Sequence, residues 1–486
     1  MRHIAVHSDA RKGEAKPSLF VRFTALCCSA VLAASLALPS IAFAEVRKSD
    51  IVLGDTVEAR GLTVAQCPSI DALYACVMDD SGTVYFERDA ASPTQIASLT
   101  KIMTCVIALD SVSDGLVSLD DTLSVSAEAA HVGESSAGLQ EGDELTLDAA
   151  LYALMVPSGN DAAIAISEFV GQRMSDAAGG GDPEQLFVDA MNDKAAELGC
   201  VDTVYRNPHG LDNDDFSGDQ HSCAADQARI VKYGMQNERF SDIVSGGDAV
   251  ITVSRASEGD VGSSRQSVEV QLESTDLFLD MYEYACGVKT GITKLAGPSF
   301  AGAAYNGERY LYAIVIHSSS EAQRFNDAET LCEWVYGNLV DYNLVNSEQT
   351  LPVQTNEGEV QAPVVANVSH TDWIDVTIPA VLSDPDATVE LFKLNGNVSQ
   401  SFEFNEVHGN VHAGDVLGKA SFKQRNQVIA EYDIVAAADV AAPNFFENIG
   451  IWWDKLFRGF SGEPQTAEST VLNTTPLLND KSSAVR

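Results

Sequence analysis

Two β-hairpin patterns at the ends of a helix-rich region constrain the fold of this chain most strongly. The stretch "ALYACVMDDSGTVYFERDA" has alternating apolar runs on both sides of Asp80-Ser81-Gly82. The stretch "SFAGAAYNGERYLYAIVIH" has strand-like runs on both sides of the Asn306-Gly307 turn. Short turns of this kind join antiparallel strands. The simplest arrangement is one antiparallel sheet that takes strands from both ends and is covered by the helices between them.

Helical periodicity fills the chain between the hairpins and continues after the second one. Apolar residues recur at helical spacing over residues 98–112, 182–199 and 320–339. Residues 145–170 are typical of two apolar helices, broken at residues 157–160 because proline and glycine enforce a turn there. We therefore predict an α/β domain over this region.

The sequence pattern changes after residue 347. Alternating apolar residues, frequent turn residues and few helical periods predict a small all-β domain over 348–440. Residues 441–460 predict an amphipathic helix, and 461–486, which are rich in Ser, Thr and Pro, predict a disordered tail. The first folded domain is then expected over residues 45–347.

The first 44 residues have the features of an export signal. A basic start precedes the apolar run "ALCCSAVLAASLALPSIAFA", which ends in the small-x-small cleavage pattern Ala42-Phe43-Ala44. A transmembrane anchor is the alternative interpretation of this run. No other stretch is apolar for long enough to span a bilayer. We therefore predict a secreted, extracytoplasmic protein whose signal peptide is residues 1–44.

Charge and cysteine spacing argue against several classes of protein. A net charge of -40 would repel nucleic acid, and it argues against electrostatic attachment to anionic lipid. Two of the nine cysteines, Cys27 and Cys28, lie in the signal segment, and the others show no C-x-x-C spacing. The chain also lacks an H-E-x-x-H stretch. We expect no nucleic-acid partner, no metal site and no cofactor.

The stretch "ASLTKIMT" places Ser98 three residues before Lys101, where the first predicted helix begins. A serine hydroxyl is a poor nucleophile until a base removes its proton. Positions i and i+3 share a helix face, and lysine can be the base if burial or a second cation lowers its pKa. S-x-x-K also occurs by chance on exposed helix faces, so the pair alone is a weak signal.

Two further tripeptides follow in order. Residues 158–160, Ser-Gly-Asn, lie on the predicted turn between two helices, where a hydroxyl and an amide can both point into a cleft. Residues 289–291, Lys-Thr-Gly, precede a strand pattern; the glycine allows close approach of a substrate backbone, and the lysine and threonine can hold a carboxylate. S-x-x-K, S-x-N and K-T-G in this order are the signature of penicillin-recognising serine acyl-transferases.

On these motifs the chain resembles the low-molecular-mass penicillin-binding proteins, the serine-type D-alanyl-D-alanine carboxypeptidases. Further stretches similar to the family's follow in the family's order: "NPHGLD" at 207–212, "GVKTGIT" around Lys289, and "AGDVLGKASF" in the β domain. The resemblance covers roughly residues 70–440. It implies a β-lactamase/DD-peptidase-like α/β fold, with an antiparallel sheet flanked by helices, followed by a small all-β domain.

The resemblance also implies a role for each residue of the site. Ser98 would attack the carbonyl between the two terminal D-alanines of a peptidoglycan stem peptide and form an acyl-enzyme, with Lys101 as its base. Ser158 would relay a proton toward the leaving amine. β-Lactam antibiotics would acylate the same serine. The implied substrate-binding residues are Asn160, Lys289, Thr290, Gly291, Arg324 and Ile292, whose backbone N–H would form the oxyanion hole with that of Ser98.

Three alternatives remain beside carboxypeptidase activity. A DD-endopeptidase that cuts peptide cross-links would use the same groups. A class A β-lactamase would need an E-x-x-L-N stretch between the second and third motifs, and none occurs between Asn160 and Lys289. A catalytically silent envelope scaffold would not need to keep the serines and lysines of all three motifs.

The stretch "NFFENIGIWWDKLFRGF" at 444–460 predicts a membrane-surface helix. On a helix its large apolar residues fall within an arc of roughly 140°, with Ile451 as the exception, and its four charged residues fall outside the arc. Packing against the β domain is the alternative. Aromatic side chains favour the membrane interface, and the resemblance implies an amphipathic helix on the outer face of the cytoplasmic membrane.

Overall fold

The computed structural model describes residues 67–212, 219–256, 264–355 and 358–478. The predicted signal peptide, residues 1–44, lies outside these ranges and stays a prediction. Within the described ranges, none of the helices combines the length and apolar character that crossing a bilayer requires.

A five-stranded antiparallel sheet forms the centre of the first domain, in the order β2-β1-β9-β8-β7. Its strands are β1 (Tyr74–Asp79), β2 (Val84–Arg88), β7 (Ala285–Gly291), β8 (Ser299–Tyr305) and β9 (Tyr310–Ile316). The two predicted hairpins lie next to each other, because Tyr74 of β1 pairs with Ile316 of β9. The prediction of one sheet that takes strands from both ends of the region is confirmed.

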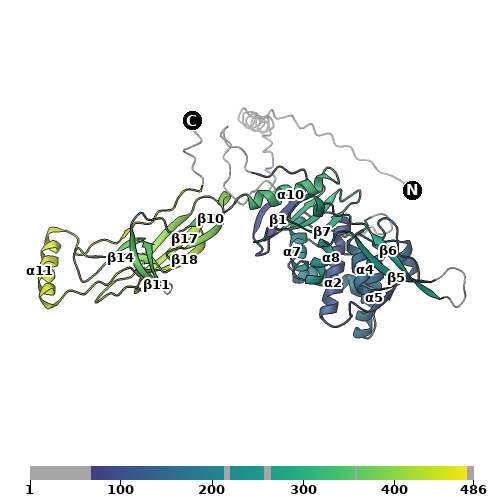
Figure 1. The fold of residues 1–486 in the computed structure, drawn as a ribbon, viewed down its shortest axis with the longest axis horizontal. Coiled ribbons are helices and arrows are strands. Elements are labelled where there is room, and N and C mark those ends of the chain that lie inside the picture. Colours follow the sequence, from purple (N-terminus) through teal and green to yellow (C-terminus); the bar gives the residue numbers. More distant parts are fainter. Residues whose placement is uncertain (1–66, 213–218, 257–263, 356–357, 479–486) are drawn as a thin grey trace, which may run out of the picture. The chain divides into compact units, whose positions relative to one another are not determined.

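Helices cover both faces of this sheet, and alternate residues of β1 point to opposite faces. Cys76 and Met78 belong to a large apolar core shared with the central helices, whereas Ala75 and Val77 belong to a second core shared with α10 (Gln323–Tyr336). Figure 1 shows α10 on one side of β1 and α7 on the other. The sheet is therefore buried on both faces and offers a rigid support for a site.

The remaining described helices of this domain include those predicted over residues 98–112, 145–170 and 182–199, together with others that were not predicted. They are the short 3-10 helix η2 (Ala97–Leu99), α2 (Thr100–Ser113), α3 (Ala127–His131), α4 (Leu147–Met155), α5 (Asn160–Ala178), α6 (Pro183–Glu197), α7 (Ala224–Gly234), α8 (Glu238–Ser245) and α9 (Phe278–Met281). α2 is buried on almost every side, as expected for a helix that is apolar all round. The predicted break between two apolar helices lies between α4 and α5.

A second sheet, four-stranded in the order β3-β4-β5-β6, lies outside the central one. Its strands are β3 (Thr122–Ser124), β4 (Glu144–Thr146), β5 (Ala249–Ala256) and β6 (Arg265–Leu272). The first two have three residues each, too short for an alternating pattern to identify them in the sequence.

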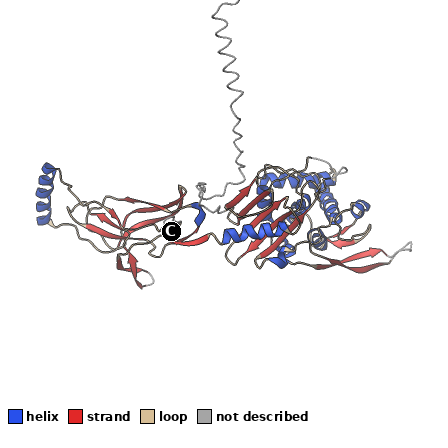
Figure 2. Cartoon of the chain, turned by 90° about the horizontal axis from the view of Figure 1, so that it is seen from above, coloured by secondary structure: helices blue, strands red, loops and turns tan. Residues whose placement is uncertain are grey.

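The C-terminal region is built of strands, as Figure 2 shows, and the predicted all-β domain is confirmed. A six-stranded sheet contains β16 (Ser399–Phe404), β17 (Val416–Gln424), β18 (Gln427–Ala436), β14 (Thr377–Leu382), β13 (Ala366–Ser369) and β19 (Thr470–Val471). Two further sheets have two strands each: β10 (Leu339–Asn343) pairs with β15 (Thr388–Phe392), and β11 (Thr350–Thr355) pairs with β12 (Gly358–Pro363). A short 3-10 helix, η3 (Lys393–Asn395), follows β15. β10 precedes the predicted boundary at residue 348, so pairing with this region begins earlier than predicted.

The prediction of a disordered tail over residues 461–486 is wrong for part of the segment. β19 pairs with β13 as an edge strand, and the buried amide of Asn473 donates to the Leu344 carbonyl and to Gln400 Oε1, each at 2.8 Å. A polar composition conceals this order because edge pairing uses backbone groups and Asn473 is held by hydrogen bonds. Residues 479–486 lie outside the described ranges.

Helix α11 (Phe445–Ser461) occupies the stretch predicted to be an amphipathic helix. Its first turn has a capping box formed by Asn444 and Glu447. One face lies against the β region, where Lys455 Nζ donates to the Thr371 carbonyl at 2.8 Å. Ile451, the apolar residue outside the predicted arc, is half-buried, as Lys455 is, which explains the exception.

Candidate active site

The first motif lies where η2 meets α2. Lys101 Nζ donates to Ser98 Oγ at 2.9 Å, so the spacing of three residues brings the two side chains together. Ser98 is half-buried, whereas Lys101 is fully buried in the first turn of α2. A partly exposed hydroxyl beside a buried amine is the arrangement that an activated serine requires.

The second motif comes from the turn between α4 and α5. Lys101 Nζ lies 3.4 Å from Ser158 Oγ and 2.6 Å from Asn160 Oδ1, so the amine contacts both motif side chains. Ser158 has a φ of 65°, in the left-handed region that L-residues rarely adopt. Asn160 also donates its Nδ2 to the Gly133 carbonyl at 2.9 Å, which orients the amide.

Burial lowers the pKa of Lys101 well below its ordinary value, and the nearby charge of Lys289 lowers it further. Asp161 opposes this shift. An amine that is neutral at moderate pH can accept the proton of the Ser98 hydroxyl, whereas a charged ammonium cannot.

The third motif forms the end of β7, directly beside η2. A Cβ placed on Gly291 would lie 2.9 Å from the carbonyl oxygen of Ile96 and 3.3 Å from the backbone nitrogen of Leu99. Only glycine permits this approach, which brings the third motif against the segment that carries Ser98.

Lys289 and Thr290 are both buried on β7. Burial lowers the pKa of Lys289 to about 7, with Arg324 acting in the same direction and Asp276 opposing it. Thr290 Oγ1 lies 2.7 Å from Thr275 Oγ1. The two motif side chains thus place a cation and a hydroxyl next to the Ser98 segment.

Arg324 and Ile292 flank the third motif. Arg324, on α10, is buried and its Nη1 donates to the Gly291 carbonyl at 3.4 Å, while its Nη2 lies 3.5 Å from Glu321. Ile292 follows Gly291 directly and leaves its side chain half exposed. The structure therefore brings Arg324, on a helix distant in sequence, to the same strand end as the motif.

The stretch 207–212 forms a turn beneath Ser98. The Asn207 side chain accepts the backbone N–H groups of His209 and Gly210, and Thr104 of α2 donates to the Pro208 carbonyl at 2.5 Å. Burial lowers the pKa of His209 to about 3. A histidine that stays neutral and is held in a turn has a structural role here.

Asp161 is a supporting residue that sequence reasoning missed. Its buried carboxylate accepts the Ser136 hydroxyl at 2.6 Å and the backbone N–H groups of Ala137 and Leu139 at 3.0 and 3.2 Å. These bonds hold the loop before β4 against the start of α5. Its position directly after the second motif was the one available signal.

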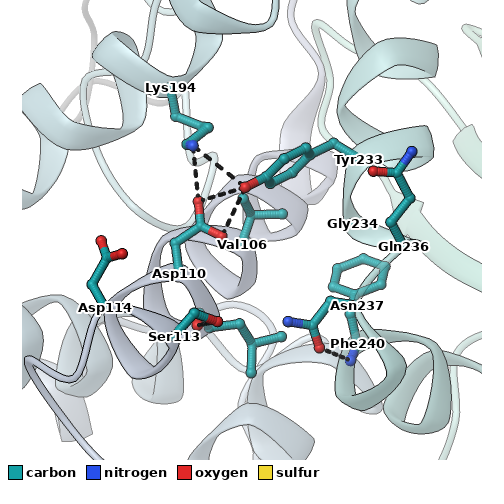
Figure 3. A pocket seen from close by; sticks show the side chains of 11 residues that line it. Val106, Asp110, Ser113, Asp114, Lys194, Tyr233, Gly234, Gln236, Asn237 and Phe240 are labelled. Atoms are coloured by element: carbon teal, nitrogen blue, oxygen red, sulfur yellow. Dashed lines mark hydrogen bonds and ion pairs between the residues drawn. The ribbon is translucent and has the colours of Figure 1, made fainter.

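A pocket elsewhere in the domain has different chemistry (Figure 3). It lies at the C-terminal end of α2, where Lys194 Nζ is 3.1 Å from Asp110 and the Tyr233 hydroxyl donates to the same carboxylate at 3.0 Å. Its Ser113 hydroxyl donates to the Leu109 carbonyl, so this serine is not paired with a base. The three motifs, and not this pocket, form the candidate active site.

A second group of polar residues also lies outside the motifs. The Asp202, Asp226 and Cys223 side chains approach one another within 4.8 Å. The Asp226 carboxylate already contacts Arg229 Nη1 at 2.6 Å and Thr203 Oγ1 at 2.9 Å. A neighbouring guanidinium disfavours a cation, so we assign no metal to this group.

Comparison with known proteins gives consistent similarities. Residues 62–320 match the family model Peptidase S11, described as D-alanyl-D-alanine carboxypeptidase. The chain is 25% identical over 373 residues to D-alanyl-D-alanine carboxypeptidase DacF of Bacillus subtilis (strain 168). This alignment covers 75% of the chain and 85% of the relative.

Solved structures similar to this chain agree with these matches. A mutant of the Streptomyces K15 DD-transpeptidase is 26% identical, with a TM-score of 0.50, and the match covers 56% of this chain and 100% of that one. The D-alanyl-D-alanine carboxypeptidase DacD from Francisella tularensis is 21% identical, with a TM-score of 0.52, over 80% of this chain and 99% of that one. The latter likeness concerns the fold alone.

Proposed function

The chain belongs to the Peptidase S11 family of D-alanyl-D-alanine carboxypeptidases, which are serine-type hydrolases, and from this premise we propose that Ser98 is its nucleophile. The observation that carries the proposal is the 2.9 Å contact between Ser98 Oγ and the fully buried Lys101 Nζ. The substrate is a peptidoglycan stem peptide that ends in D-Ala-D-Ala.

The reaction begins with the transfer of the Ser98 proton to neutral Lys101. Ser98 Oγ attacks the carbonyl between the terminal alanines, and backbone N–H groups of Ser98 and Ile292 stabilise the oxyanion that forms. The C–N bond then breaks. A proton passes from Lys101 through the Ser158 hydroxyl, 3.4 Å away, to the leaving nitrogen of D-alanine. Water hydrolyses the acyl-enzyme and restores Ser98.

The terminal carboxylate of the substrate is held by the third motif. Lys289 supplies a positive charge, Thr290 a hydroxyl donor and Arg324 a second cation beside Gly291. Asn160 binds the peptide amide next to the scissile bond. Gly291 permits the substrate backbone to lie along β7.

Incubation of the purified protein with a fluorescent penicillin and with a D-Ala-D-Ala pentapeptide tests this function. Wild type should be labelled at Ser98, as peptide mass analysis would show, and should release one D-alanine per pentapeptide without a metal. Cleavage of cross-linked dimers with little release of D-alanine would favour the endopeptidase alternative. Labelling of a residue other than Ser98 would overturn the assignment.

The protein is proposed to act outside the cytoplasm, on the outer face of the cytoplasmic membrane. Support comes from the signal pattern of residues 1–44 and from α11, which buries none of its residues fully. Phe446 and Phe460, at opposite ends of the helix, are each 82% exposed, and Trp452 and Trp453 are half exposed between them. An aromatic face of this size is typical of a helix that lies in a membrane interface.

A further inference from the structure

A buried carboxylate, Asp276, lies outside all three motifs and has no role in the reaction described above. It precedes α9 and is 8% exposed. Its Oδ1 accepts the backbone N–H of Phe278 at 3.0 Å. Its Oδ2 is one of four buried side-chain N or O atoms that lack a hydrogen-bond partner in the part of the chain that the structure describes. A second such atom is Nε of Arg324.

The segment that carries Asp276 is fixed against the third motif. The neighbouring Thr275 shares a hydrogen bond of 2.7 Å with Thr290, and its backbone N–H donates to the Val156 carbonyl at 3.2 Å. Asp276 therefore directly follows the residue that is hydrogen-bonded to Thr290, the neighbour of Lys289 on β7, and the Asp276 and Lys289 side chains interact electrostatically.

The charged groups around this pair come from several elements. Arg324 of α10 adds positive charge near Lys289, and the exposed Asp280 of α9 adds negative charge near Asp276. Lys101 of α2 is a second amine near Lys289, but its lowered pKa keeps it largely neutral. Burial and the neighbouring charge of Arg324 both disfavour a charged Lys289. Asp276 is the carboxylate that acts in the opposite direction.

Asp276 acts on the charge of Lys289 without taking up the hydrogen-bonding capacity of its amine. The hydrogen bond that Lys289 Nζ donates goes to the Thr290 carbonyl at 3.1 Å, and the one that the Asp276 carboxylate accepts comes from Phe278. A direct ion pair would compete with a ligand for the ammonium group. A carboxylate that acts through space supports the charge and leaves the ammonium available to an incoming carboxylate.

We propose that Asp276 is a positioning residue that keeps Lys289 charged, so that Lys289 can bind the terminal carboxylate of the substrate. The inference rests on the proposed function of the third motif and deepens it. Burial raises the pKa of Asp276 to about 7, near the value of about 7 for Lys289, so both groups change charge in the range where activity is measured. As pH rises through that range, the charge that Asp276 gains opposes the loss of the Lys289 proton.

The test is the pH profile of kcat/KM for D-alanine release, measured on wild type, Asp276→Asn, Asp276→Glu and Asp280→Asn. Without the Asp276 charge, Lys289 loses its proton at lower pH. The alkaline limb of the kcat/KM profile of Asp276→Asn should therefore lie about one pH unit lower than that of wild type, mainly because KM increases. Asp276→Glu keeps the carboxylate, so its alkaline limb should lie close to that of wild type. Asp280→Asn removes an exposed charge on the same segment and should leave the alkaline limb at its wild-type position.

A second substrate separates charge from structure. A pentapeptide with an amidated C-terminus has no carboxylate for Lys289 to bind, so its KM should not distinguish Asp276→Asn from wild type. An unshifted limb in Asp276→Asn, or an equal loss of activity at every pH in both Asp276 variants, would overturn the proposal. Penicillin labelling of wild-type Ser98 at pH 6 is independent of this result: its absence would refute the proposed function itself.

Discussion

Lys101 Nζ lies 2.9 Å from Ser98 Oγ although the lysine side chain is 0% exposed. Burial of an amine is unfavourable unless it stays neutral or gains hydrogen bonds. Here the amine is shared among Ser98, Ser158 and Asn160, so one buried group links the first two motifs.

Replacement of Lys101 by arginine tests whether the amine is the base. Guanidinium keeps the positive charge but does not lose a proton, so Lys101→Arg should lower the rate of Ser98 acylation by at least about 100-fold. Ser98→Ala should abolish labelling by a fluorescent penicillin. Lys194→Arg, a matched change at the Asp110 ion pair, should leave the rate near wild type. A Lys101→Arg protein that is acylated at the wild-type rate would contradict the assignment of the base.

The pH dependence of acylation should follow the lowered pKa of Lys101. Since the base must be neutral, the rate should rise with pH through this pKa, well below the ordinary lysine value of 10.5. The same shift has a consequence for stability. Between the folded pKa and 10.5 the unfolded chain binds more protons, so the contribution of Lys101 to stability increases with pH. Any stability advantage of Lys101→Met over wild type in chemical denaturation should therefore shrink as pH rises.

The sequence predicted the central sheet and the three motifs because both depend on local patterns. Hairpin turns and helical spacing identify strands and helices, and Ser98 and Lys101 are neighbours on one helix. The sequence could not predict that Gly291 packs against Ile96, or that Thr275, the residue before Asp276, is hydrogen-bonded to Thr290, because these contacts depend on how segments pack in three dimensions. The tail was mispredicted because composition does not reveal an edge strand.

Two substitutions of Ser158 can separate the role of its hydroxyl from the strain of its backbone. Its φ of 65° costs an L-residue about 1 kcal/mol, a cost that glycine avoids. Ser158→Gly and Ser158→Ala both lack the proton-relay hydroxyl and should both lose most D-alanine release. Ser158→Gly should nevertheless be more stable than Ser158→Ala by about 1 kcal/mol in chemical denaturation. Equal stability of the two variants would show that the turn relaxes, and full activity of either would remove Ser158 from the mechanism.

Gly210 should be required for the position of Ser98. Its φ is +93°, and a Cβ there would lie 1.9 Å from the carbonyl oxygen of Ala97, the residue before the nucleophile. Gly115 is the matched control because its φ is +73° but a Cβ at that position would have nothing within 4 Å. Gly115→Ala should cost about 1 kcal/mol and leave acylation unchanged. Gly210→Ala should cost more and slow penicillin labelling; similar values for the two variants would contradict the proposed close packing.

The last prediction concerns attachment through α11. Truncation before Asn444 would be a poor test, because it would also remove β19 and the buried Asn473 from the β region. Point changes on the exposed face avoid this problem. Replacement of Trp453 and Phe457, whose rings stack with centroids 6.1 Å apart, by serine should weaken binding to neutral lipid vesicles by at least about tenfold.

The basic residues of α11 provide the matched control for this experiment. Lys455 and Arg458 face the β region, where Arg458 Nη2 lies 3.1 Å from Asp375. Their replacement by glutamine should therefore leave vesicle binding nearly unchanged, and binding of wild type should persist in high salt, because attachment depends on apolar burial rather than on charge. D-Alanine release from a soluble pentapeptide should be the same in all variants. Vesicle binding that disappears in high salt, or that survives the loss of both aromatic side chains, would contradict attachment through this face.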